Sequence, residues 1–232
     1  QALSGENAQK YNTLEPIAFD VAEIETEQIF KKQIVGNENS TVSGLINKLE
    51  NSDWVKDGLN YLPTEIETEN ETCPFCQEQT ISSQLLQSIK EYFDESYEAD
   101  LTALKQFRKQ YAEAIQLIPE KITFENNPKF ENHKKDFEIK YNAFNKVVTE
   151  NLKLIDDKIK TPSVQITLKS SVTALTEING VIDNINKQVK EHNKKIDQKE
   201  TALNDLKIDF WNIMRWEYDQ TISSYISDKV QS

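Results

Sequence analysis

The sequence predicts an all-α protein, an elongated helical bundle with an antiparallel coiled-coil arm. The 232 residues include only five Gly and six Pro, so long stretches run without a helix breaker. Between residues 175 and 213, apolar residues recur in alternating steps of three and four, which is typical of a coiled-coil seam. No strong strand pattern competes with the helices. Short alternations at 120–125 and 164–168 predict extended connectors only.

The first segment, residues 1–62, is expected to hold two helices. Apolar spacing predicts them at 19–32 and 42–61, and the polar stretch 36–40 between them predicts a loop. Residues 63–82 follow as an acidic loop that leads into a Cys-Pro-Phe-Cys turn. We therefore expect a helical N-terminal segment that is separated by this loop from the longer helices.

Long helices are expected over residues 83–160. The first should end before Pro119, because proline cannot continue a helix. A connector near 119–128 follows. The pair Asn127-Pro128 is typical of a helix N-cap and first turn, so a second long helix is expected to begin there and to fill the rest of this region.

The last segment, residues 161–232, is expected to be one long helix that starts at Thr161-Pro162 and carries the seam. Ten of the twelve seam positions are apolar, and the polar exceptions, His192 and Lys199, are expected to fix the register. A seam of this kind requires a partner helix, and we expect an antiparallel one from the same chain. The seam consists of Leu175, Ile178, Ile182, Ile185, Val189, His192, Ile196, Lys199, Leu203, Leu206, Phe210 and Ile213.

The two cysteines of the chain stand together as Cys73-Pro74-Phe75-Cys76. This spacing can present two thiolates to one tetrahedral metal ion, but a closed structural zinc site takes four ligands. The hypothesis is a zinc site shared between two chains, with Cys73 and Cys76 supplied by each. Reduced, unliganded thiols and an intrachain disulfide or redox pair remain open as alternatives. Gln77 follows where a zinc knuckle often has Gly.

The net charge of -12 is unevenly distributed. Residues 1–100 carry 20 acidic and 6 basic side chains, a net charge of -14, whereas residues 101–232 carry 19 acidic and 21 basic, a net charge of +2. We therefore expect no nucleic-acid binding, since phosphate contacts require clustered Lys and Arg. The chain has no run of eighteen apolar residues and no signal-like start, so no membrane span is predicted and the cytoplasm is the expected location.

Sequence motifs for catalysis are missing. The chain has two His, no Gly-rich phosphate loop and no Gly-x-Ser-x-Gly elbow. No nucleophile, base and orienting group can be assembled from the spacing. We therefore expect that this chain is not itself an enzyme and that no residue in it is catalytic or holds a nucleotide.

Several stretches in combination resemble the middle region of bacterial AAA-domain ATPases, the group that includes the anticodon nucleases PrrC and RloC. They are Trp54-Val55-Lys56-Asp57-Gly58-Leu59, Cys73-Pro74-Phe75-Cys76-Gln77, Tyr92-Phe93-Asp94-Glu95-Ser96-Tyr97, Glu191-His192-Asn193-Lys194-Lys195-Ile196 and Phe210-Trp211. The resemblance covers about residues 40–225. It implies a split ATP-binding-cassette head with a long helical insertion, which in RloC is likened to a zinc hook.

The resemblance implies that this chain is the insertion, a structural and interaction arm of a larger P-loop ATPase with a role in phage defence. Its partners would be its own ATPase head and a second copy of the chain. ATP and Mg²⁺ would bind in the head, outside this segment, as would any RNA cleavage. Only Cys73 and Cys76 carry over, as metal ligands. The alternatives are a stand-alone thiol redox or metal-binding enzyme and an adaptor coiled coil unrelated to ATPases.

Overall fold

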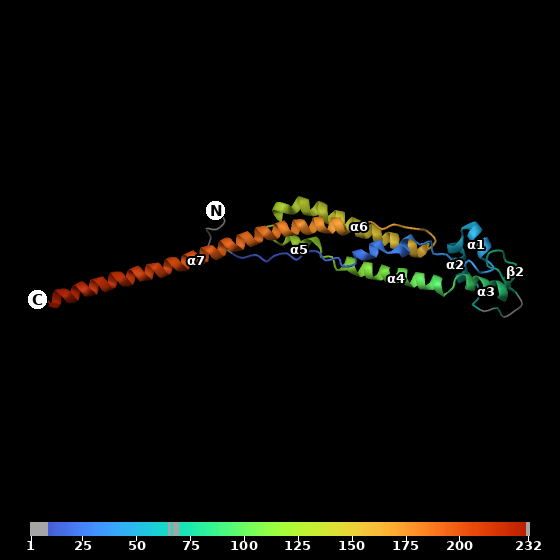
Figure 1. The fold of residues 1–232 in the computed structure, drawn as a ribbon, viewed down its shortest axis with the longest axis horizontal. Helices are drawn as coiled ribbons and strands as arrows, with labels where there is room; N and C mark the ends of the chain where they lie inside the picture. Colours follow the sequence, from blue (N-terminus) through green and yellow to red (C-terminus); the bar gives the residue numbers. More distant parts are fainter. Residues whose placement is uncertain (1–8, 65, 67–69, 231–232) are drawn as a thin grey trace. The chain divides into compact units, whose positions relative to one another are not determined.

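The chain is mostly helical, as predicted, in a computed structural model that describes residues 9–64, 66 and 70–230 (Figure 1). Two short strands accompany the helices. The elements in chain order are η1 (Ala22–Thr26), η2 (Gln28–Lys31), α1 (Ser43–Leu49), α2 (Ser52–Gly58), η3 (Leu59–Tyr61), β1 (Asn70–Thr72), β2 (Gln79–Ser82), α3 (Ser83–Tyr92), α4 (Glu95–Gln116), α5 (Lys121–Glu125), η4 (Glu131–His133), α6 (Lys134–Lys160) and α7 (Val172–Val230), where η marks a 3-10 helix.

The chain divides into two compact units, and each is built from stretches that are distant in sequence. The first unit comprises Gln1–Pro16, Glu120–Phe137 and Asn179–Ser232, and the second comprises Ile17–Pro119 and Glu138–Ile178. Helices α6 and α7 each contribute residues to both units. The two units are described separately below.

In the first unit, residues 9–14 lie as an extended segment beside α7 (Figure 1). The side-chain amide of Asn193 accepts from the Tyr11 N–H at 3.0 Å and donates to the Tyr11 carbonyl at 2.8 Å. Asn186 pairs with Leu14 in the same way, at 2.7 and 2.8 Å. Asn186 and Asn193 are seven residues apart on a helix, and Tyr11 and Leu14 are three residues apart on an extended chain. Both separations are about 10 Å, so the two side-chain amides lie opposite the two backbone positions that they bind. The two side-chain amides thus form the hydrogen bonds with the N–H and carbonyl groups of Tyr11 and Leu14 that a neighbouring β-strand would otherwise form.

His192 lies against the same extended segment. Its ring stacks on Tyr11 with 4.4 Å between ring centroids and 5° between the planes, and its Nε2 lies 3.1 Å from the Gln9 carbonyl oxygen. Lys10 forms an ion pair with Asp197 one turn further along α7. His192, one of the two polar positions of the seam, therefore binds the N-terminal segment.

The seam of α7 is buried over its first half only. Ile182, Ile185 and Val189 are fully buried and Ile196 nearly so. From residue 203 onward the seam is exposed, with Leu203 at 46% of its full exposure, and Leu206, Phe210 and Ile213 are more exposed still. The expectation that the whole seam packs within the chain is therefore wrong for these last four positions, because no described residue covers them.

In the second unit, two of the predicted helices are broken by local backbone geometry. Asp94 ends the expected 83–118 helix after α3, because its carboxylate caps α4 by accepting from the Ser96 and Tyr97 N–H groups at 3.0 and 3.1 Å. Glu50, at φ 50°, terminates α1 in the left-handed region and divides the expected 42–61 helix. The expected 19–32 helix is two 3-10 turns, η1 and η2.

The predicted helix start at Thr161-Pro162 is also wrong, since α7 begins at Val172. Hydrogen bonds outside any helix hold the residues between, among them that of the Ile166 N–H to the Phe30 carbonyl at 2.9 Å. Lys158 adds to them, since its buried ammonium donates to the carbonyls of Lys32, Pro162 and Val164 at 2.6 Å each. These bonds hold the residues after α6 against residue 32. Burial lowers the pKa of Lys158 to about 8, with the Asp53 carboxylate acting in the opposite direction, so the amine stays largely protonated at neutral pH.

The connector between α4 and α6 differs from prediction in two respects. Residues 121–125, expected to be extended, form the short helix α5. Asn127 does not cap α6, which begins at Lys134. Its carboxamide oxygen instead accepts from the Lys129 N–H at 2.9 Å in a local turn. A short polar side chain such as that of Asn can close a local turn as readily as it can cap a helix. The pair Asn127-Pro128 is therefore compatible with either structure.

A buried carboxylate joins four stretches of the second unit. Glu25 accepts from the Tyr111 hydroxyl at 2.6 Å through Oε1 and from the Ser171 N–H at 2.7 Å through Oε2. Asn151 donates to Glu25 at 3.3 Å and pairs with the Lys169 backbone at 2.7 and 2.9 Å. Burial raises the pKa of Tyr111, and the hydrogen bond to Glu25 raises it further. The tyrosine therefore remains a donor at any ordinary pH.

Burial along the seam predicts unequal effects of truncation at two of its positions. Ile185→Ala should lower the free energy of unfolding by about 2 to 5 kcal/mol, because it leaves a cavity at a fully buried site. Leu203→Ala should lower it by about 0.5 kcal/mol or less, since that side chain is largely solvated already. Urea unfolding followed by circular dichroism measures both. Equal losses would contradict the half-buried seam.

Removing the Lys158 ammonium should leave the Lys32 and Val164 carbonyls without this donor, while the Pro162 carbonyl keeps the Ile34 N–H at 3.1 Å. We expect Lys158→Met to lower the free energy of unfolding by about 2 to 4 kcal/mol. Lys153→Met, the same change at an exposed position of α6, is the control and should change it by about 0.5 kcal/mol or less. A Lys158→Met protein as stable as the control would refute the role given to these bonds.

Candidate functional site

The two cysteines lie in the turn of a β-hairpin. Strands β1 and β2 pair antiparallel, with Asn70 opposite Ser82. The cysteine turn, residues 73–78, is closed by the Cys73 N–H donating to the Glu78 carbonyl at 2.8 Å and the Gln77 N–H donating to the Cys73 carbonyl at 2.8 Å. The sequence did not predict these strands, because segments of three and four mostly polar residues carry no usable alternation.

Gln77 takes the backbone conformation that the cysteine turn requires. Its φ of 62° lies in the left-handed region, where a residue with a Cβ is strained and glycine is favoured. A zinc knuckle often has glycine at this position. The residue at this position therefore departs from that pattern in type, while its backbone adopts a conformation that glycine favours.

The surroundings of Cys73 shift the pKa of its thiol downward. Backbone hydrogen bonds from Cys76, and then from Phe75, lower the pKa of the Cys73 thiol, and burial opposes them. Cys73 is buried and Cys76 is exposed, with its Sγ 3.8 Å from the Thr80 hydroxyl. The thiolate is the form that binds metals and attacks disulfides, so the turn is suited to either chemistry.

Cys73 and Cys76 could supply two of the four ligands of a tetrahedral zinc site. Both come from one short turn, while a structural zinc ion takes four ligands. Within residues 9–64, 66 and 70–230, no three His, Cys, Asp or Glu side chains gather at one point where they could hold a metal ion. His133 and His192 are engaged elsewhere, the former 2.8 Å from the Gln188 amide and the latter on Tyr11. The remaining two ligands would have to come from outside the described part of this chain.

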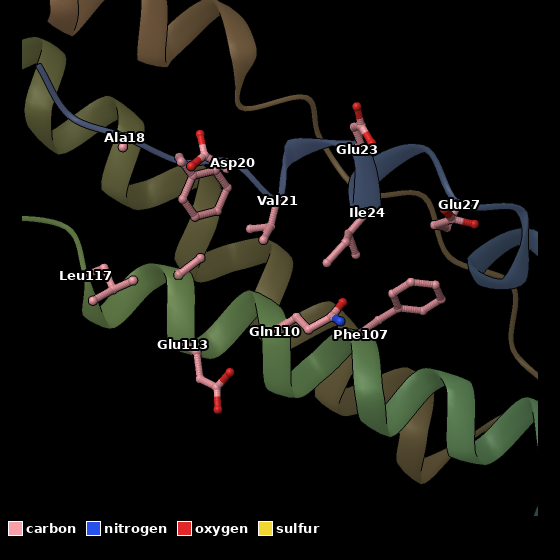
Figure 2. Close-up of a pocket in the computed structure, with 12 residues that line it drawn as sticks. Ala18, Asp20, Val21, Glu23, Ile24, Glu27, Phe107, Gln110, Glu113 and Leu117 are labelled. Carbon is pink, nitrogen blue, oxygen red and sulfur yellow. The ribbon is translucent and has the colours of Figure 1, made fainter.

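A separate groove lies in the second unit between residues 18–27 and α4, with a cavity of about 590 Å³. Figure 2 shows Ile24 and Phe107 facing this space from its two sides. Its ionisable lining residues are four carboxylates, those of Asp20, Glu23, Glu27 and Glu113. The lining residues are Ala18, Phe19, Asp20, Val21, Glu23, Ile24, Glu27, Phe107, Gln110, Glu113, Ala114 and Leu117.

Comparison with known proteins identifies the class to which this helical, hairpin-bearing chain belongs. A family model described as AAA domain (AAA_13) matches residues 1–232. The chain therefore belongs to the AAA domain family and is an ATPase-related region. No curated protein and no solved structure matches it. Across the described residues, none of the helices combines the length and apolarity needed to cross a membrane.

The left-handed residue of the cysteine turn can be tested by substitution. Gln77→Val should lower the free energy of unfolding by about 1 to 2 kcal/mol, because a β-branched side chain opposes φ near 60°. Gln77→Gly should be neutral or slightly stabilising, since relief of strain offsets the entropy of glycine. Thermal unfolding of the two variants under reducing conditions compares them. A tolerated valine would argue against this turn geometry.

Proposed function

We propose that this chain is a structural and interaction arm, a helical insertion of a larger P-loop ATPase. We further propose that Cys73 and Cys76 supply half of a zinc-hook-like site shared by two copies. The observation that carries the first part is the exposed apolar surface of the distal half of α7, residues 203–226. The cysteine turn carries the second.

The distal half of α7 presents more apolar surface than an isolated helix tolerates in water. Because successive residues are rotated by about 100°, its twelve large apolar side chains spread over more than half of the helix circumference. Surfaces of this kind mark interaction sites, so a partner beyond the described residues is expected. The twelve are Leu203, Leu206, Ile208, Phe210, Trp211, Ile213, Met214, Trp216, Tyr218, Ile222, Tyr225 and Ile226.

The proposed arm has a structural role and neither binds nucleotide nor catalyses a reaction itself. The sequence has no phosphate-binding loop, so ATP and Mg²⁺ would be held by the head of the parent protein. Membership of the AAA domain family supports such a parent. Contact with nucleic acid is not proposed, because the first hundred residues have a net charge of -14. The proposed location is the cytoplasm, and any nuclease activity of the PrrC and RloC kind would lie outside this segment.

In the shared site, zinc would act as a structural cross-link. When bound, it would join four thiolates, two from each chain, and so link two arms. Cys73 would enter as the buried thiolate that backbone N–H groups stabilise, and Cys76 as the exposed one that meets the partner first. The same lowered thiol pKa favours a second candidate function, a thiol redox pair, in which these cysteines would cycle between dithiol and disulfide.

Two observations on the full-length protein test the arm. Its reading frame should encode ATP-binding motifs on both sides of this segment, and a chain without them would contradict the insertion. A photo-crosslinking amino acid at Trp211 or Tyr218 should capture another helix of the same assembly. The same group at Leu117, an exposed residue of the second unit, is the control and should not capture that helix. Equal capture from both places would deny a specific role to the distal half of α7.

The zinc hypothesis predicts stoichiometry and association together. Protein prepared under reducing conditions should contain about one Zn²⁺ per two chains, as four-ligand sites require. Chelation should dissociate the dimer, and Cys73→Ser with Cys76→Ser should abolish both metal and dimer. Elemental analysis and light scattering make the measurement. A zinc-free monomer whose cysteines form a reversible disulfide would support the redox function instead.

A further inference from the structure

Three exposed aromatic rings gather at the cysteine turn, around the ring of Phe75. Trp54, Tyr61 and Phe75 retain 59%, 68% and 54% of their full exposure. The Phe75 ring centroid lies 5.4 Å from that of Trp54 and 6.1 Å from that of Tyr61. These three residues, here called the aromatic cluster, include Phe75, which is one of the two residues between the cysteines. The cluster and the thiols are therefore parts of one surface.

The aromatic cluster is held in place by the elements that carry it. Trp54 belongs to α2 and Tyr61 to η3, which contact each other directly. The Phe75 ring lies over Gly58, where an added Cβ would be 3.8 Å from the ring. A ring that packs on a helix surface while its outer face stays open loses little entropy when a partner arrives. The cluster is thus a preformed contact surface.

The size of the aromatic cluster limits what it can do alone. Three aromatic rings that are each more than half exposed present roughly 300 to 400 Å². Specific interfaces bury about 800 Å² on each partner, so this surface is too small to hold a stable dimer unaided. The aromatic cluster is nevertheless large enough to contribute strongly to an interface that a second interaction first brings together, because Trp and Tyr are typical of the residues that dominate binding energy.

A shared zinc ion would place a second copy against these rings. Zinc–sulfur bonds of about 2.3 Å bring all four thiolates within about 4 Å of one another. Phe75 is adjacent in sequence to Cys76, and consecutive Cα atoms are about 3.8 Å apart. The ring of each chain would therefore lie at the partner's turn. None of the three rings carries a charge that would oppose a symmetric approach.

We propose that Trp54, Tyr61 and Phe75 form the contact surface on which a second copy of this chain is seated, so that dimerisation requires the rings as well as the metal. This inference rests on the proposed zinc-linked dimer and assigns its interface. The metal supplies the link between the two turns, and the aromatic cluster excludes water around it.

The test is the zinc-dependent dimerisation of the whole chain with Trp54→Ala and Tyr61→Ala combined. Both cysteines and Phe75 are left unchanged, so the ligands are intact. We expect the dimer dissociation constant, measured by sedimentation at saturating Zn²⁺, to rise at least tenfold. Leu117→Ala with Ile139→Ala removes comparably exposed apolar surface from the same unit and is the matched control. It should dimerise like the unaltered chain.

Two further readouts exclude a folding artefact. The aromatic variant should keep the far-ultraviolet spectrum and cooperative unfolding of the unaltered chain. With Co²⁺ in place of Zn²⁺ and protein above the weakened dissociation constant, it should show the same four-thiolate absorption. An undiminished zinc-dependent dimer in this variant would overturn the inference and leave the proposed function standing. Failure of the unaltered chain to dimerise with Zn²⁺ would overturn both.

Discussion

The second unit depends on one buried carboxylate. Glu25 accepts hydrogen bonds from α4 through Tyr111, from α6 through Asn151 and from the segment before α7 through the Ser171 N–H. A buried charge without such donors would be strongly destabilising, so these stretches must stay together around it. Lys158 imposes a similar constraint with its three carbonyl partners. The hydrogen bonds of these two side chains hold η1 and residues 32, 162, 164 and 171 in place within this unit.

In the first unit, a different constraint determines how far α7 is covered. Asn186 and Asn193 match the spacing of an extended segment, and burial of the seam continues only as far as Ile196. Beyond it the helix continues with apolar side chains that no described residue covers. A helix that extends past the residues that cover it, and still carries an apolar surface there, is suited to contact another part of an assembly. This is the physical basis of the proposed arm.

The cysteine turn differs from a hook at the tip of two long helices. It lies in a hairpin, with short helices α2 before it and α3 after it. Contacts between two such turns would therefore involve the hairpin and the aromatic cluster, with no coiled coil leading directly into them. The backbone of the turn places Gln77 in the left-handed region, and its N–H groups lower the pKa of the Cys73 thiol.

The sequence by itself determined the helical class, the seam of α7 and the cysteine pair, because helical periodicity and Cys-x-x-Cys spacing are local properties. It also indicated the family. Only the tertiary structure decided where helices break, since Asp94 and Asn127 carry the same capping chemistry but only Asp94 caps a helix. It likewise decided which half of the seam is buried and that Phe75 gathers Trp54 and Tyr61 beside the thiols. Those outcomes depend on contacts between residues far apart in the chain, which periodicity does not encode.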